Sequence, residues 1–338
     1  MISIERNAPP SPDVVICECF ARDGLQHETT ILPAAHKAEL IDAFAGAGFM
    51  RVEATSYSNP AIVPQFADAS EVLRLLPRRP SVFYKATCAN VRAVERALLD
   101  SEAGIGANEI SVLVSASESH SLKNLKRTRA EQWQNIDAMV ERAGSAFRVI
   151  GTVSVAFGCP FEGRVEEATV IHAIESFLVR GVKWVTLGDT TGMATPASVS
   201  SLTARIARQF PEVTLIAHFH DTRGTALANC VAAYEAGVRY FDASFGGVGG
   251  HPAKVRYGGG YTGNVCTEDL VNLFETMGVE TGIDLALLLD LAARCEAALD
   301  RQLNGRVTRS GLNPLLGACM QPLDAPGSPD PSVRGING

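Results

Sequence analysis

The sequence has no excess of basic residues and no long hydrophobic run. Its 30 Lys and Arg residues stand against 37 Asp and Glu residues, which gives a formal net charge of −7. Binding to the phosphate backbone of nucleic acids requires the opposite balance, so we expect no nucleic-acid partner. The most apolar run, 285–293, is too short to cross a bilayer and contains Asp290, so we expect no membrane span.

Signals for secretion and for structural cysteine sites are also lacking. Residues 1–13 contain three prolines and no basic segment followed by an apolar run, so we expect a short leader into the first strand and not a signal peptide. The eight cysteines form no CxxC pair, which argues against a disulfide-rich scaffold. We therefore expect reduced thiols, mostly packed in the core, and a cytoplasmic protein.

Eight short runs of β-branched and apolar residues alternate with longer segments of helical periodicity. The runs are 14–20, 50–56, 82–87, 109–115, 148–156, 184–187, 213–219 and 240–245. Between them the spacing of apolar residues predicts helices over 33–47, 65–76, 91–99, 129–143, 165–180, 196–210 and 225–236. Two more helices are expected after the last run, over 267–277 and 284–303.

Strict alternation of strand and helix predicts a parallel sheet, because parallel neighbours can be joined only by a long crossover. Eight repeats close most simply as a (β/α)₈ TIM barrel, and we expect its strands to be apolar on both faces. A doubly wound open sheet is the alternative fold, but it usually carries GxGxxG after an early strand, and the turn at 21–25 does not. We assign 1–303 to the barrel with its C-terminal helices and 304–338 to a Gly- and Pro-rich tail.

Polar residues at the C-terminal ends of the predicted strands are candidates for the functional site, because barrel enzymes place their chemistry there. Arg22 and Asp23 follow the first strand, and Gly24 is expected to allow a tight turn that aims them into the barrel mouth. A surface arginine beside a turn-capping aspartate is the alternative. Glu53 lies near the end of the second strand, and Asp189 follows the sixth. For Asp189 a contact with substrate and a place in the N-cap region of the next helix are equally good interpretations.

His218 and His220 end the seventh strand in a metal-ligand pattern. Residues i and i+2 of a strand point to the same face, roughly 6.5 Å apart along it, so two imidazoles can converge on one ion. Two histidines bonded to backbone carbonyls are the alternative. A pair at the C-terminal end of a strand favours the ligand interpretation.

A glycine-rich segment, 246–264, follows the eighth strand and contains His251, Lys254, Arg256 and Asn264. Loops at this place in a barrel commonly hold phosphates or close as lids, although a flexible surface loop is also rich in glycine. We expect Lys254 and Arg256 to contact phosphates or a substrate carboxylate, with solvated loop charges as the alternative.

Together these motifs resemble the 3-hydroxy-3-methylglutaryl-CoA lyase family of metal-dependent TIM-barrel lyases and synthases. The resemblance runs from about 14 to 303. It rests on RDGLQ at 22–26, EATS at 53–56, FGCPFEG at 157–163, GDT at 188–190, HFHDT at 218–222 and GN at 263–264. The first and fifth motifs are shared with the isopropylmalate and homocitrate synthases, whereas the third, and the absence of a large C-terminal regulatory domain, favour the lyase.

The resemblance implies a divalent metal held by Asp23, His218, His220 and Asn264. Oxygen and imidazole ligands suit Mg²⁺ or Mn²⁺, with Zn²⁺ as an alternative. The implied reaction is retro-Claisen cleavage of an acyl-CoA substrate, a 3-hydroxyacyl thioester, to acetyl-CoA and a ketone such as acetoacetate.

Further roles follow from the same resemblance. Arg22 would meet the charge that develops on the thioester oxygen, Gln26 would contact substrate, and Glu53 and Asp189 would belong to the catalytic set. The family has a catalytic cysteine directly after a Gly-Gly pair, and this chain has His251 there, so His251 is the candidate proton donor.

The presence of His251 in place of the family's cysteine leaves the identity of the substrate open. The alternatives are a different 3-hydroxyacyl-CoA or 2-oxo acid, the condensing direction, or a catalytically inactive barrel with a binding role. The sequence also leaves the oligomeric state open, a homo-oligomer included.

Overall fold

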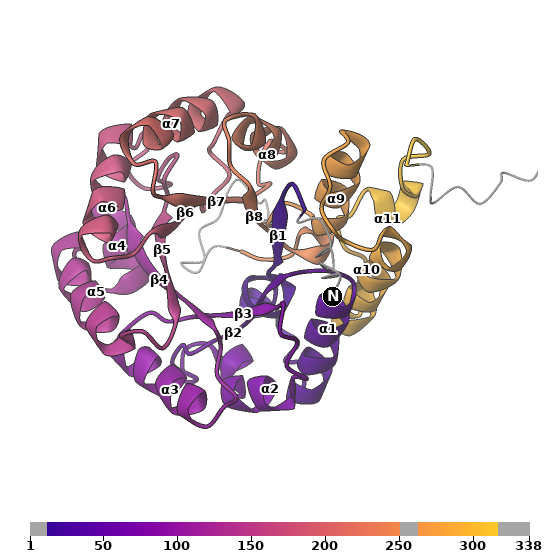
Figure 1. The fold of residues 1–338 in the computed structure, drawn as a ribbon, viewed down its shortest axis with the longest axis horizontal. Helices are drawn as coiled ribbons and strands as arrows, with labels where there is room; N and C mark the ends of the chain where they lie inside the picture. Colours follow the sequence, from indigo (N-terminus) through magenta and orange to yellow (C-terminus); the bar gives the residue numbers. More distant parts are fainter. Residues whose placement is uncertain (1–11, 251–262, 317–338) are drawn as a thin grey trace, which may run out of the picture.

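The computed structural model describes residues 12–250 and 263–316. Eight parallel strands close into a barrel in chain order, with β1 hydrogen-bonded to both β2 and β8, which confirms the predicted (β/α)₈ fold (Figure 1). The strands are β1 (Val15–Glu18), β2 (Arg51–Ser56), β3 (Phe83–Thr87), β4 (Glu109–Ser115), β5 (Arg148–Ser154), β6 (Trp184–Asp189), β7 (Thr214–Phe219) and β8 (Tyr240–Ala243).

Helices surround the barrel, and α9, α10 and α11 gather beside β1 and α1 (Figure 1). Helix α4 is not among the helices predicted from the sequence. Its residues are mostly polar, and it buries only His120 and Ser121. The helices are α1 (Ala34–Gly46), α2 (Ala69–Leu75), α3 (Val91–Glu102), α4 (Glu118–Leu125), α5 (Arg129–Ala143), α6 (Glu167–Val179), α7 (Pro196–Gln209), α8 (Ala226–Glu235), α9 (Thr267–Thr276), α10 (Leu285–Leu299) and α11 (Val307–Ser310).

Local sequence signals explain where several helices begin. Helix α7 starts at Pro196, whose missing N–H costs nothing at the first helical position, and the Thr195 hydroxyl accepts a hydrogen bond from the backbone N–H of Ser198. Helix α5 begins with a capping box between Thr128 and Glu131.

The strands are apolar on their outer faces, and the expectation of two apolar faces holds only in part, because the inner face mixes polar and apolar residues. Val52, Tyr84 and Ile110 pack outward into the core beneath the helices. Several inward positions are polar: Arg51 and Glu109 form an ion pair of 2.9 Å inside the barrel, and the Arg51 guanidinium lies over the inward rings of Trp184 and Tyr240. Leu113 also faces inward and lines the cavity. The alternation along β3 and β4 therefore separates an apolar helix-facing side from an interior that holds most of the polar residues.

Among the described residues no helix has the length and apolar character needed to cross a bilayer. The seven cysteines in this part of the chain are free thiols, and all are buried. After α10 the chain is fastened to α9, because both carboxylate oxygens of Asp269 accept hydrogen bonds from the backbone N–H of Arg306, and Val307 N–H also donates to Asp269.

Candidate active site

The C-terminal ends of the strands surround a cavity of about 1120 Å³. Its walls include Arg22, Asp23 and Gln26 after β1, and His218 and His220 at the end of β7. The structure therefore brings together residues that are nearly two hundred positions apart in the chain, at the edge of the barrel where the sequence places the chemistry.

The turn after β1 is a π-helical turn over Phe20–Gly24. Gly24 lies in the ordinary right-handed region, with φ of −56°, so the expectation that its conformational freedom makes the turn is wrong. A Cβ at this position would lie 2.8 Å from Val248 Cγ2, so glycine is needed for close packing against the loop that follows β8.

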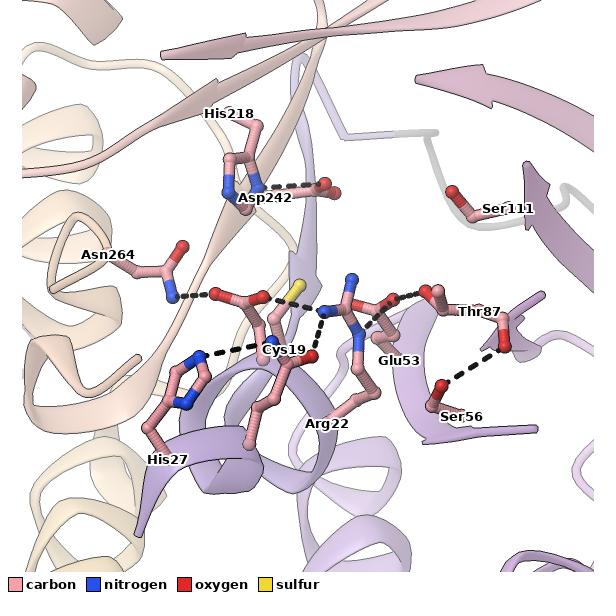
Figure 2. A network of polar contacts seen from close by, with 12 residues as sticks. Cys19, Arg22, His27, Glu53, Ser56, Thr87, Ser111, His218, Asp242 and Asn264 are labelled. Atoms are coloured by element: carbon pink, nitrogen blue, oxygen red, sulfur yellow. Dashed lines mark hydrogen bonds and ion pairs between the residues drawn. The ribbon is translucent and has the colours of Figure 1, made fainter. Parts of the chain in front are cut away.

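The Arg22 guanidinium is held from three sides (Figure 2). Its Nε donates to Glu53 Oε1 at 2.7 Å, and its Nη1 donates to Asp23 Oδ1 at 2.7 Å and to Gln26 Oε1 at 3.3 Å. The Thr87 hydroxyl donates to the same Glu53 oxygen at 2.7 Å. Burial disfavours the charged form of Arg22, but the negative charges of Glu53 and Asp23 outweigh the effect of burial and raise the pKa of Arg22 above its usual value. Glu53 thus orients a permanently protonated arginine at the edge of the cavity.

The two histidines converge as their spacing predicts. His218 Nε2 and His220 Nε2 are 3.1 Å apart, and His220 Nε2 is 3.8 Å from Asp23 Oδ2. Ligand atoms of Asp23, His218 and His220 all lie within 4.8 Å of one another. Burial disfavours the charged form of Asp23, but Arg22 and the two imidazoles outweigh it and lower its pKa below the usual range, so the carboxylate stays ionised.

Asn264 completes the cluster from the far end of the glycine-rich segment. Its amide nitrogen donates to Asp23 Oδ2 at 2.7 Å and to the Val248 carbonyl at 2.9 Å. Its amide oxygen is buried and has no hydrogen-bond partner within 12–250 and 263–316. One carboxylate, two imidazoles and an unsatisfied amide oxygen form a donor set that fits a divalent cation, as the resemblance implies.

A second layer of groups orients His218. Asp242 Oδ2 lies 3.3 Å from His218 Nδ1 and 3.3 Å from Lys85 Nζ. Burial raises the pKa of Asp242, but Lys85 and His218 outweigh it and lower the pKa below the usual range. A carboxylate on the far ring nitrogen of a metal-ligating histidine fixes the tautomer that leaves the other nitrogen free for the metal.

Gly249 allows the loop after β8 to approach this cluster. Its φ of +133° is unfavourable for other residues, and a Cβ would lie 2.3 Å from Asn264 Nδ2 and 3.0 Å from Asp23 Oδ2. The predicted residues that follow it, His251, Lys254 and Arg256, lie outside the described residues.

Asp189 has a different setting from the other predicted site residues. It is the last residue of β6, and its two oxygens accept hydrogen bonds from the backbone N–H groups of Met193 at 2.7 Å and Ala194 at 3.1 Å. Burial raises its pKa to about 6. Gly188 and Thr190 line the cavity on either side of it. The Asp189 carboxylate therefore stabilises the turn over 189–194, which places Thr190 at the cavity wall.

Sequence reasoning missed several cavity residues, chiefly Lys85, Ser111, Thr152 and Asp242. A signal was present, because each is a polar residue flanked by apolar neighbours inside a predicted strand. Period-two alternation of this kind places polar side chains on one face, but it does not say whether that face points inward.

Residues 13–294 match the model of the HMGL-like family. The chain is 37% identical over 298 residues to the mitochondrial hydroxymethylglutaryl-CoA lyase of Macaca fascicularis, a match covering 88% of this chain and 89% of the relative. It is also 37% identical over 311 residues to the (R)-citramalyl-CoA lyase of Chloroflexus aurantiacus, covering 88% and 95%. A solved HMG-CoA lyase from Acinetobacter baumannii, in complex with coenzyme A and 3-methylmalate, superposes with a TM-score of 0.82 at 38% identity, covering 89% of this chain and 95% of that one.

The barrel, the site at its C-terminal edge and these relatives define the class of protein, which is an enzyme that cleaves carbon–carbon bonds. The chain belongs to the HMGL-like family of lyases, which confirms the resemblance seen in its motifs.

Proposed function

We propose that the protein catalyses the divalent-metal-dependent retro-Claisen cleavage of a 3-hydroxy-3-methylglutaryl-CoA-like thioester to acetyl-CoA and acetoacetate or a related keto acid. The observation that carries the proposal is the convergence of Arg22, Asp23, His218 and His220 at one cavity, with Asn264 hydrogen-bonded to Asp23. The relatives named hydroxymethylglutaryl-CoA lyase support the reaction class.

In this reaction the tertiary hydroxyl on C3 gives up its proton to water, and the C2–C3 bond of the thioester then breaks as the C3 oxygen becomes the carbonyl oxygen of the released keto acid. Mg²⁺ or Mn²⁺, held by Asp23, His218, His220 and Asn264, would supply the Lewis acidity that lowers the pKa of that hydroxyl. The electron pair of the broken bond moves onto the acetyl thioester as an enolate. Arg22, fixed by Glu53, stabilises the negative charge on the enolate oxygen.

A proton must then reach C2 of the enolate to complete acetyl-CoA. We propose His251 for this step on the sequence alone, because it follows Gly249 and Gly250 where the family pattern has its catalytic cysteine. Lys254 and Arg256 are proposed to contact the CoA phosphates or a substrate carboxylate.

Three further residues have roles in the proposed site. Gln26 contacts Arg22 and lines the cavity, which suits a residue that meets substrate. Glu53 and Asp189 act by positioning, the first through Arg22 and the second through its loop. A cytoplasmic location remains the prediction from the eight cysteines.

A second candidate is the same cleavage of citramalyl-CoA, which would release pyruvate. It is favoured by the identity to (R)-citramalyl-CoA lyase, which equals the identity to the hydroxymethylglutaryl-CoA lyase. Both substrates carry a tertiary hydroxyl on C3, the carbon two bonds from the thioester carbonyl carbon, so the residues assigned above would serve either one.

The test is an assay of acetyl-CoA release from both thioesters with Mg²⁺ or Mn²⁺. We expect one to be cleaved, cleavage to stop in chelator, and His220→Ala to lose nearly all turnover together with the bound ion. His172→Ala is the matched control, because His172 is an exposed helix residue with a side chain 71% accessible. Release of acetyl-CoA by His220→Ala in chelated buffer would show that the site assignment is wrong. Binding of thioester and Mn²⁺ without cleavage would favour a barrel with a binding role.

A further inference from the structure

Two cysteines at the first strand direct their side chains into the barrel. Cys17 lies in β1 and pairs in register with Arg51 on β2 and with Asp242 on β8. Residues in register on neighbouring strands share a face of the sheet, so Cys17 faces the interior as these two residues do. Cys19 follows the last residue of β1, and its sulfur is directed toward the side of the site where His218 and Asp242 lie (Figure 2). Both cysteines are fully buried.

The two sulfurs and the carboxylate of Asp242 form a compact donor set. Ligand atoms of Cys17, Cys19 and Asp242 all lie within 4.8 Å of one another. Two zinc–sulfur bonds of about 2.3 Å at a tetrahedral angle place their sulfurs about 3.8 Å apart, so small side-chain rotations would bring these atoms to bonding positions. The set differs in chemistry from the catalytic cluster, because it has two sulfurs where that cluster has imidazoles and an amide.

The Asp242 carboxylate has one oxygen that is not used by its neighbours. Its Oδ2 lies 3.3 Å from His218 Nδ1 and 3.3 Å from Lys85 Nζ. Its Oδ1 is buried and has no hydrogen-bond partner within the part of the chain that the structure describes. Buried carboxylate oxygens are normally paired, because an unpaired one loses its hydration without compensation. A cation bound at Oδ1 would supply that compensation and leave both contacts of Oδ2 in place.

A disulfide between the two cysteines is disfavoured by their positions in the chain. Side chains two residues apart along a strand leave it roughly 6.5 Å apart, whereas a disulfide needs Cβ atoms about 3.8 Å apart. Closing that gap would require the backbone to leave β8, to which the N–H of Cys19 donates at the Ala243 carbonyl, 2.8 Å away. An ion that bridges the two sulfurs makes no such demand on the backbone.

Binding of an ion requires the thiols to lose their protons. Burial raises the pKa of the Cys19 thiol well above its usual value, so this group stays protonated in the absence of an ion. A bound dication reverses that preference, because a thiol that coordinates a metal is deprotonated. Uptake of the ion therefore releases one proton from each thiol. One dication with two thiolates then adds no net charge to the barrel interior.

We propose that Cys17, Cys19 and Asp242 form a second metal site, behind the catalytic cluster, that takes a thiophilic divalent ion such as Zn²⁺ or Cd²⁺. Mg²⁺ and Mn²⁺ prefer oxygen ligands, so the two sites separate ions by the softness of their donors. Asp242 lines the cavity, which gives an ion a route to the sulfurs. Three protein ligands leave a fourth position for water. The inference does not depend on which thioester the enzyme cleaves.

The test is a titration of the full-length enzyme with Cd²⁺, in the presence of excess Mn²⁺ to keep the catalytic cluster filled. Bonds between thiolates and Cd²⁺ give a charge-transfer absorption in the ultraviolet that oxygen and imidazole ligands do not give, so this band reports the sulfur site alone. We expect the band to saturate at one Cd²⁺ per chain with release of two protons. Cys17→Ala with Cys19→Ala should lower the Cd²⁺ affinity by more than about 100-fold, because loss of a group that only orients a ligand already costs about 10- to 100-fold.

Cys88→Ala with Cys230→Ala is the matched control. These two thiols are also buried and free, but they pack in the core beneath the helices, so their removal should leave the Cd²⁺ band and affinity at wild-type values. Thermal unfolding checks that each variant folds. If the Cys17 and Cys19 alanine variant does not fold, serine at both positions keeps the size of the side chains and should remove the band as well. No band in wild type, or a wild-type band in a folded variant that lacks Cys17 and Cys19, overturns the inference.

Two further measurements test the third ligand and the choice of ion. Asp242→Asn should lower the Cd²⁺ affinity by about 10- to 100-fold while the band at saturation keeps its intensity, because both sulfurs remain. An unchanged affinity would remove Asp242 from the site. Zn²⁺ should displace Cd²⁺ and abolish the band, whereas Mg²⁺ at the same concentration should not. Displacement by Mg²⁺ would contradict a site built on thiolates.

Discussion

Replacing Gly249 by alanine should weaken metal binding without changing any predicted ligand. The new Cβ would lie 2.3 Å from Asn264 Nδ2 and 3.0 Å from Asp23 Oδ2, whereas non-bonded atoms prefer about 3.5 Å or more. Relief of the first contact requires a shift of about 1 Å, which breaks the hydrogen bonds from Asn264 to Asp23 and to Val248. Groups that orient metal ligands typically account for about 10- to 100-fold in affinity, so we expect a loss of that size.

Gly181→Ala is the control for backbone strain. Gly181 has φ of +76° and open space around its Cβ position, so alanine there has the unfavourable conformation without the collision, at a cost of about 1–2 kcal/mol in stability. Mn²⁺ affinity is measured for both variants by the electron paramagnetic resonance signal of the free ion, and folding by thermal unfolding. Wild-type Mn²⁺ affinity in Gly249→Ala, with its fold intact, would refute the assignment of Asn264 and Asp23 to the metal site.

Three other predictions concern single residues. Glu53→Gln should lower kcat by about tenfold with Mn²⁺ affinity unchanged, because Arg22 loses its charged partner; an equal loss of metal affinity would place Glu53 in the metal site instead. His251→Ala should reduce kcat by about a hundredfold and keep the metal, and full activity would remove His251 from the mechanism. Burial raises the pKa of Glu18 to about 8, so ionisation of Glu18 in the unfolded chain destabilises wild type as pH rises from about 4.5 to about 8. Glu18→Gln should therefore gain stability relative to wild type by about 3 to 4 kcal/mol between pH 5 and pH 8 in urea unfolding, and a gap that does not change with pH would contradict the raised pKa.

The order of strands and helices followed from the sequence because hydrophobic periodicity is local. Eight alternating units leave few ways to bury both a parallel sheet and its helices, so the barrel could be predicted without any long-range contact. The pairing of His218 with His220 was predictable for the same reason, since residues i and i+2 of a strand share a face.

Contacts between residues that are far apart in the chain depend on closure of the barrel. Asp23 and Asn264 are 241 positions apart and meet at 2.7 Å, and Lys85 on β3 reaches Asp242 on β8 across the interior. Periodicity shows that polar residues share one face of a strand, but only the closed sheet determines that this face points inward and which strand lies opposite it. The inward-facing polar residues and the second layer behind His218 therefore belong to the tertiary structure, whereas the strands and most of the candidate ligands could be predicted from the sequence alone.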